Sequence, residues 1–136
     1  EEMDNGTAWM AAALREGRPV TLFTNQRRNP VWVETLCAAC LALAERLSSP
    51  AGNYRGVLNV AGRQVMTRAA FGLRMLDWWG VAERATLSLG LDESGQWPPD
   101  CTMDVNRAES LLPVTLWGVD ELLARAGRED LPQARA

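Results

Sequence analysis

The segment from Leu36 to Ala44 restricts the fold most, because it contains no polar side chain over about two and a half helical turns. A helix at the surface of a small domain normally has an apolar stripe and a polar face. A helix that is apolar all round and rich in small residues is typical of a position between two packed layers. The rest of the sequence supplies one such layer. We therefore expect a helix over residues 34–48 whose second covering layer lies outside this chain.

Glycine and proline divide the sequence into alternating strand-like and helix-like segments. Runs of β-branched and aromatic residues predict strands at residues 20–24, 56–61 and 85–89. Capping residues and terminal glycines predict helices at residues 7–16, 34–48, 67–79, 106–112 and 119–126. This alternation is typical of the α/β class. We expect one domain over residues 1–127 and a flexible tail over residues 128–136.

The composition excludes several classes of site. All 14 positive charges are arginine, and the chain contains neither lysine nor histidine. Catalytic arrangements built on histidine, histidine-based zinc sites and the phosphate-binding lysine of P-loops are therefore excluded. The sequence also lacks Gly-x-Gly-x-x-Gly, the glycine-rich turn that binds dinucleotides. As a free-standing enzyme, such a chain has few groups for acid and base chemistry.

Charge and hydropathy also bear on partners and location. The net charge is −3 and the basic residues form no block, so we expect no nucleic-acid partner. The longest uncharged apolar run, residues 36–44, is too short to cross a bilayer, so we expect no membrane partner. Three cysteines, an odd number in a short chain, do not make a disulfide framework and favour a cytoplasmic location.

Cys37 and Cys40 form a Cys-x-x-Cys pair, which in redox proteins needs a thiolate activated at a helix N-terminus. Here both residues lie inside an alanine-rich helix without a positive neighbour, so we expect them to pack as small hydrophobic groups. Cys101 is distant in sequence, and we expect no metal site. A thiol redox protein is the alternative that this pair allows. Tyr54 has Leu58 four residues later in place of lysine, so it forms no Tyr-x-x-x-Lys catalytic pair.

Two loops carry the candidate binding residues. One follows a predicted strand and contains two amides and two guanidinium groups, those of Asn25, Gln26, Arg27 and Arg28. Arginine suits bidentate recognition of phosphate, and loops at strand ends often hold ligands. The other loop is rich in proline and carries Trp97, which can stack on a flat group of a ligand. The alternatives are a solvated turn for the first loop and, for the second, a tryptophan buried in the core beneath it.

Three stretches, in order, resemble one known family. Residues 20–36, with the run Thr-Asn-Gln-Arg-Arg-Asn-Pro, resemble a strand, turn and helix start of dTDP-4-dehydrorhamnose reductase-like proteins. Residues 56–62 and 67–72, the latter reading Thr-Arg-Ala-Ala-Phe-Gly, resemble the next strand and helix of that family. Residues 97–108, which begin Trp-Pro-Pro-Asp, resemble its closing element. The chain is thus similar, over roughly residues 7–126, to part of an extended short-chain dehydrogenase.

The resemblance implies the C-terminal, substrate-binding portion of an NAD(P)H-dependent oxidoreductase that reduces a dTDP-4-keto-sugar. It implies that a Rossmann half of the parent protein binds NAD(P) and supplies the catalytic tyrosine and lysine. This chain itself then binds no cofactor, carries no catalytic residue and contacts the nucleotide-sugar substrate through Asn25, Gln26, Arg27, Arg28 and Trp97. Two departures from the family pattern are Asn25 in place of aspartate and Gln96–Trp97 where an arginine precedes the proline.

The resemblance also explains the apolar helix at residues 34–48, because in relatives that helix packs against the Rossmann half. Without that half, we expect the chain to self-associate through the exposed face of this helix. The alternative function is a non-catalytic protein-interaction module of the same fold family.

Overall fold

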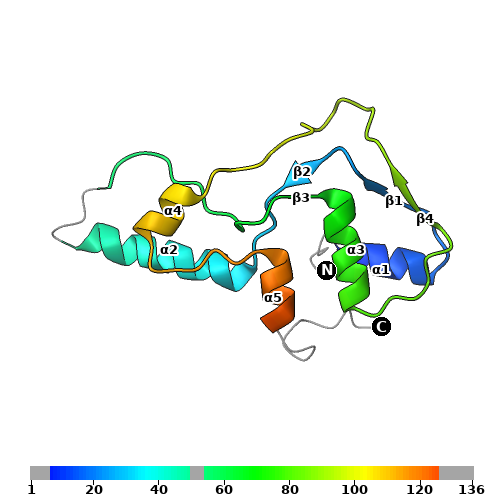
Figure 1. The fold of residues 1–136 in the computed structure, drawn as a ribbon, viewed down its shortest axis with the longest axis horizontal. Coiled ribbons are helices and arrows are strands. Elements are labelled where there is room, and N and C mark those ends of the chain that lie inside the picture. Colours follow the sequence, from blue (N-terminus) through cyan, green and yellow to red (C-terminus); the bar gives the residue numbers. More distant parts are fainter. Residues whose placement is uncertain (1–6, 50–53, 126–136) are drawn as a thin grey trace.

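A computed structural model describes residues 7–49 and 54–125, which contain five helices and four short strands (Figure 1). The helices are α1 (Ala8–Arg15), α2 (Val33–Ser48), α3 (Arg68–Trp78), α4 (Asn106–Leu111) and α5 (Val119–Arg125). The strands are β1 (Val20–Phe23), β2 (Arg27–Arg28), β3 (Met66–Thr67) and β4 (Leu87–Gly90). The predicted tail at residues 128–136 lies outside the described residues.

The four strands form two separate pairs. β1 and β4 run parallel, with Val20 opposite Leu87 and Phe23 opposite Gly90. β2 and β3 are antiparallel across two residues each, so the segment around Arg27, for which the sequence predicts a loop, is partly a strand. A parallel pair needs a long crossover connection, and α2 and α3 lie in that connection. The chain therefore has mixed helices and strands with a short parallel sheet.

The apolar side chains form two clusters at opposite ends of the long axis in Figure 1. The first joins α1, β1 and α3, with Leu14, Val20 and Leu76 at most 2% exposed. The second joins α2 and α4 to the segment before α5, around Ala39 and Leu116. Leu116 is 0% exposed. The two clusters share no residue, so each end of the molecule has its own core.

A polar seam connects the two ends. Asn29 is 8% exposed, and its Nδ2 donates to the carbonyl oxygen of Gly62 at 3.0 Å. Its Oδ1 accepts from the backbone N–H of Met103 at 2.9 Å. One buried amide thus holds together three segments that are distant in sequence, which satisfies backbone groups that have no sheet partner.

Helix α2 covers the second cluster with one side only. Its buried residues are Thr35 and Ala39. The opposite side, which we call the outer face of α2, carries apolar or weakly polar side chains at helical spacing, all of them exposed: Val33, Cys37, Cys40, Leu41, Ala44 and Leu47. Leu41 is 65% exposed and Val33 63%. The prediction that the two thiols pack in an interior is therefore wrong for this chain, because no described layer covers the outer face.

The predicted strand at residues 56–61 is not a strand in the structure, although the chain there is extended. Val57 is 82% exposed, whereas Leu58 and Val60 pack against the second cluster, so the side chains alternate as they would in a strand. A strand needs a hydrogen-bonded neighbour, and the described residues provide none here. The predicted strand is therefore wrong for the described chain, although its side chains alternate as the pattern predicts.

The helix ends follow local chemistry. Thr67 caps α3 as predicted, because its Oγ1 accepts a hydrogen bond from the backbone N–H of Ala70 at 3.0 Å. Gly80 follows α3 with a φ of +64°, the left-handed conformation that favours glycine. Thr7 precedes α1 without a side-chain capping bond. Within the described ranges no helix combines the length and hydropathy that crossing a membrane requires.

Candidate functional site

The two loops that carry the candidate residues lie against each other. The backbone N–H of Arg27 donates to the carbonyl oxygen of Pro99 at 2.7 Å, and the N–H of Cys101 donates to the carbonyl oxygen of Arg27 at 3.1 Å. Arg27 and Asp100 also form a parallel bridge. The loop after β1 and the long loop after β4 are therefore joined through their backbones, and the structure brings residues 25–28 and residue 97 into one loop pair.

Asn25 fixes the beginning of the second loop. Its Nδ2 donates to the carbonyl oxygen of Asp92 at 3.0 Å, and its Oδ1 accepts from the backbone N–H of Asp92 at 2.9 Å. With these two bonds the side-chain amide of Asn25 takes the place of the backbone hydrogen bonds that would continue the β1–β4 sheet beyond its end. The side chain of Asn25 thus serves this loop, and contact with a substrate remains a prediction.

Gln26 is a buried amide at the centre of a partly buried polar network. Its side chain is 1% exposed, its Nε2 donates to Oδ2 of Asp92 at 2.5 Å, and its Oε1 accepts from Nη1 of Arg68 at 3.0 Å. Hydrogen bonds from Ser94 lower the pKa of Asp92 below its usual value, and the amide of Gln26 and the charge of Arg68 act in the same direction. Gln26 therefore holds the loop after β4 in position through its bond to Asp92.

Arg28 holds the proline-rich part of the second loop. Its Nη2 donates to the carbonyl oxygen of Pro98 at 3.0 Å, and its Nη1 donates to the carbonyl oxygen of Arg27 at 2.6 Å. A weaker contact of 3.4 Å joins Nη1 to the carbonyl oxygen of Pro99. Backbone carbonyls leave a guanidinium group its full positive charge, so Arg28 contributes a fixed cation beside residue 97.

Of the five candidate residues, Arg27 and Trp97 are the exposed ones. Trp97 is 62% exposed, so it does not fill the core beneath its loop, which excludes that alternative. Arg27 is exposed as well. Hydrogen bonds from Thr102 lower the pKa of Asp100, and the charges of Arg27 and Arg28 add to this effect. A cation and an accessible indole on adjoining loops are groups that suit an anionic part and a flat part of one ligand.

Sequence reasoning missed Arg68 and Asp92, which complete the network around Gln26. Asp92 begins an Asp-Glu-Ser turn in which its own Oδ1 accepts from the backbone N–H of Ser94 at 3.0 Å. That local motif is a recognisable signal. The hydrogen bond between Arg68 and Gln26, by contrast, depends on the pairing of β2 with β3. The sequence of either segment alone contains no signal that predicts it.

The loops do not fit a dinucleotide. The turn after β1 contains no glycine, and Thr24 Oγ1 instead donates to the carbonyl oxygen of Gly90 at 3.1 Å. In the described chain neither strand of the parallel pair is followed directly by a helix whose N-terminus could receive a pyrophosphate. No three metal-ligating side chains gather anywhere in residues 7–49 and 54–125. The described loops therefore lack the glycine-rich turn and the helix N-terminus that hold a dinucleotide.

The sequence matches no protein-family model and no curated protein. The structure, however, is similar to the crystal structure of UDP-glucuronic acid 4-epimerase from Bacillus cereus in complex with NAD, with a TM-score of 0.56 and 16% sequence identity. The likeness covers 93% of this chain and 38% of that chain. The chain thus shares the fold of a limited part of that epimerase. At this identity the similarity concerns the fold alone.

Proposed function

We propose that this chain is the substrate-binding portion of a short-chain dehydrogenase-like enzyme that acts on a nucleotide sugar. The observation that carries the proposal is the similarity of nearly the whole chain to a limited part of a sugar-nucleotide epimerase. In the finer form of the proposal, the parent protein is an NAD(P)-dependent reductase of a dTDP-4-keto-sugar, and the motifs at residues 20–36 and 97–108 support this form. NAD(P) and the catalytic groups then belong to a Rossmann half outside these residues.

The outer face of α2 and the extended segment at residues 57–61 support this division of labour. Leu41 and Val57 are 65% and 82% exposed, and such apolar exposure is unusual for a helix or a strand that is complete in itself. A parallel sheet with its own helices would cover the outer face of α2 and would pair with the segment at residues 57–61. Both features therefore suit a chain that packs against a larger α/β unit.

Within this proposal, the loop pair is the substrate site. Arg27 and Arg28 contact the diphosphate, and Trp97 stacks on a flat or apolar face of the nucleotide or sugar. Trp97 stands near the position where the family has an arginine before the proline. Stacking of Trp97 on the substrate would then compensate for the absence of that arginine. Asn25 and Gln26 act by holding the second loop in place, as their bonds to Asp92 indicate.

Substitution of Arg27 and Trp97 tests the proposal. Titration calorimetry of the 136-residue chain with dTDP-glucose and UDP-glucose should show binding, and Arg27→Ala should weaken it about tenfold, the effect of a charge-assisted hydrogen bond of about 1.5 kcal/mol. Trp97→Ala should weaken it by a similar factor, since base stacking on an aromatic ring contributes about 1–3 kcal/mol. Arg15→Ala, at the end of α1, is the matched control and should bind like the unchanged chain.

Unchanged affinity in both the Arg27 and Trp97 variants would assign these residues to the structure of the loops only. A preference for dTDP-glucose over UDP-glucose supports the finer form, and the reverse preference contradicts it. Oxidation of NADH or NADPH by this chain with a nucleotide sugar would contradict the division between the two halves.

A non-catalytic interaction module is the second candidate, and the outer face of α2 is the observation that favours it. In either case we expect the 136-residue chain to self-associate at micromolar concentration in analytical ultracentrifugation. Leu41→Glu should return it to a monomer, because a charge within the contact would be buried without a partner. The matched control is Leu91→Glu, which alters an equally exposed leucine in the second loop, remote from α2. A monomeric unchanged chain would contradict this prediction.

A further inference from the structure

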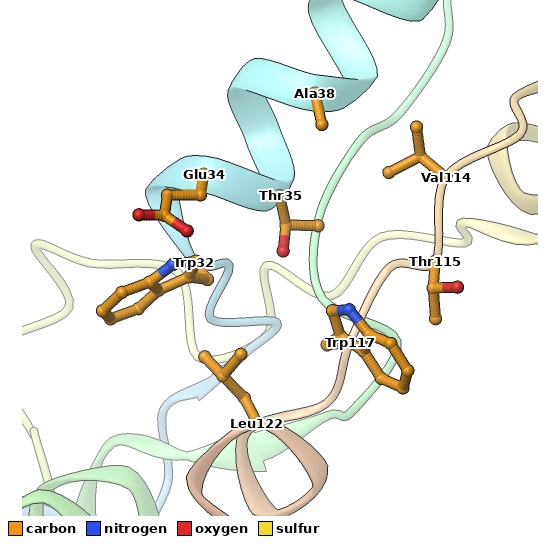
Figure 2. A pocket seen from close by; sticks show the side chains of 8 residues that line it. All are labelled: Trp32, Glu34, Thr35, Ala38, Val114, Thr115, Trp117 and Leu122. Carbon is orange, nitrogen blue, oxygen red and sulfur yellow. The ribbon is translucent and has the colours of Figure 1, made fainter. Parts of the chain in front are cut away.

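A hollow of about 300 Å³ lies between the first turns of α2, the segment before α5, and α5 itself (Figure 2). Its apolar walls include Trp32, Val114, Trp117 and Leu122, and its polar groups include Glu34 and Thr35. None of these residues belongs to the loops that carry Arg27 and Trp97, so this hollow is separate from the proposed substrate site.

Thr35 offers a hydrogen-bonding group to this hollow. The residue is 7% exposed, and its hydroxyl forms no hydrogen bond with any described part of the chain. Figure 2 shows the hydroxyl directed away from α2 into the space that Trp117 and Leu122 border. Within the described residues the only buried polar side-chain atom without a partner is Nε1 of Trp79, so the hydroxyl of Thr35 is accessible from the hollow. Its position therefore provides a hydrogen-bonding group for a bound molecule.

The charge of the hollow comes from Glu34. Its carboxylate makes no ion pair within residues 7–49 and 54–125, and Figure 2 shows it beside the indole of Trp32. A carboxylate next to an indole face attracts a cation, by charge and by cation–π interaction. The guanidinium of Arg125 lies over the ring of Trp117, 4.0 Å from its centroid. That end of the hollow is already positive, so the cation of a ligand belongs at the end formed by Trp32 and Glu34.

The size and lining of the hollow restrict the rest of the ligand. A cavity of about 150 Å³ accommodates benzene, so about 300 Å³ has room for a molecule with one or two fused rings and a short side chain. Trp32, Trp117 and Leu122 offer flat and branched apolar surface to such rings. We propose that this hollow binds a small aromatic amine, with its ammonium group at Glu34, its rings between Trp32 and Leu122, and a hydrogen bond to Thr35.

Titration of the ¹⁵N-labelled 136-residue chain with tryptamine tests this assignment. The indole N–H signals of Trp32 and Trp117, assigned from the Trp32→Phe and Trp117→Phe variants, should shift together and saturate at millimolar concentration. Indole-3-acetate has a similar ring system but the opposite charge, and should bind more weakly. Glu34→Gln should weaken tryptamine binding about threefold, the effect of a partly exposed ion pair. Thr35→Val, which keeps the shape of the side chain, should weaken it about two- to fivefold.

Glu45→Gln is the matched control, because it removes a carboxylate of the same helix outside the hollow, and it should leave the affinity unchanged. Far-UV circular dichroism checks that the Thr35 variant is folded; if it is not, the Glu34 variant, whose side chain is exposed, decides. Equal binding of tryptamine and indole-3-acetate would overturn the assignment of a cation. Absence of shifts at Trp32 and Trp117 would overturn the site itself. Neither result bears on nucleotide-sugar binding, which uses other residues.

Discussion

Gly62→Ala is expected to lower the free energy of unfolding by about 3 kcal/mol or more, the upper range for overpacking. A Cβ atom at this position would lie 2.0 Å from the carbonyl oxygen of Pro30 and 3.1 Å from that of Trp117. Both are backbone atoms, so no side-chain rotation relieves the contact. The carbonyl of Gly62 also accepts the hydrogen bond from Asn29 that connects the two ends of the molecule. Chemical denaturation followed by tryptophan fluorescence measures the effect.

Gly95→Ala is the matched control. Gly95 has a φ of +66° with nothing within 4 Å of the new Cβ, so the substitution introduces backbone strain but no collision. It should lower the free energy of unfolding by about 1–2 kcal/mol, the difference for a left-handed residue with a side chain. Equal effects of the two substitutions would show that the close approach of three segments at Gly62 is not important for stability.

Leu76→Ala and Leu116→Ala are each expected to lower the free energy of unfolding by about 2–5 kcal/mol. Both side chains are 0% exposed, and they belong to different clusters. Because each end has its own core, each variant should loosen its own end first. Hydrogen exchange should therefore speed up most in α1 and α3 for the Leu76 variant, and most in α2 and α4 for the Leu116 variant.

The control for both is Leu89→Ala, at a leucine that is 56% exposed, which should change the free energy of unfolding by no more than about 0.5 kcal/mol. If hydrogen exchange increased uniformly in the Leu76 and Leu116 variants, the two clusters would unfold as one cooperative unit. The polar seam at Asn29 would then couple them more strongly than separate cores suggest.

Local sequence signals predicted the elements well where the local chain determines them. The Thr67 cap, the glycine after α3 and the strand beginning at Val20 all appear in the structure. Residues 57–61 show the limit of this reasoning. Their alternation is that of a strand, but pairing depends on a second segment, and the described chain has none to offer. Cys37 shows the same limit. It lies in a segment whose composition is typical of an interior helix, yet it is exposed because the described chain has no layer to cover it.

The candidate site was only partly accessible from the sequence. Residue types identified Arg27, Arg28 and Trp97 as groups suited to an anionic, flat ligand, and the structure places them on adjoining loops. The structural role of the Asn25 and Gln26 side chains could not be predicted, because their hydrogen-bond partners are distant in sequence. Gln26 is buried only because Asp92 and Arg68 come to it from other segments. The hollow near Thr35 was likewise invisible, since α5 and α2 meet only in the folded chain.

The parallel pairing of β1 with β4 has a consequence for folding during synthesis on the ribosome. Thr21 and Ser88 meet through their hydroxyl groups at 3.0 Å, across 67 residues of sequence. At synthesis rates of about 5–20 residues per second, β1 waits roughly 3–13 s for its neighbour. During that interval the edge of β1 that pairs with β4 lacks its hydrogen-bonding partner, while α2 already presents its outer face. We therefore expect the nascent chain to expose an unpaired strand edge and an apolar helix face at the same time, a combination that favours aggregation.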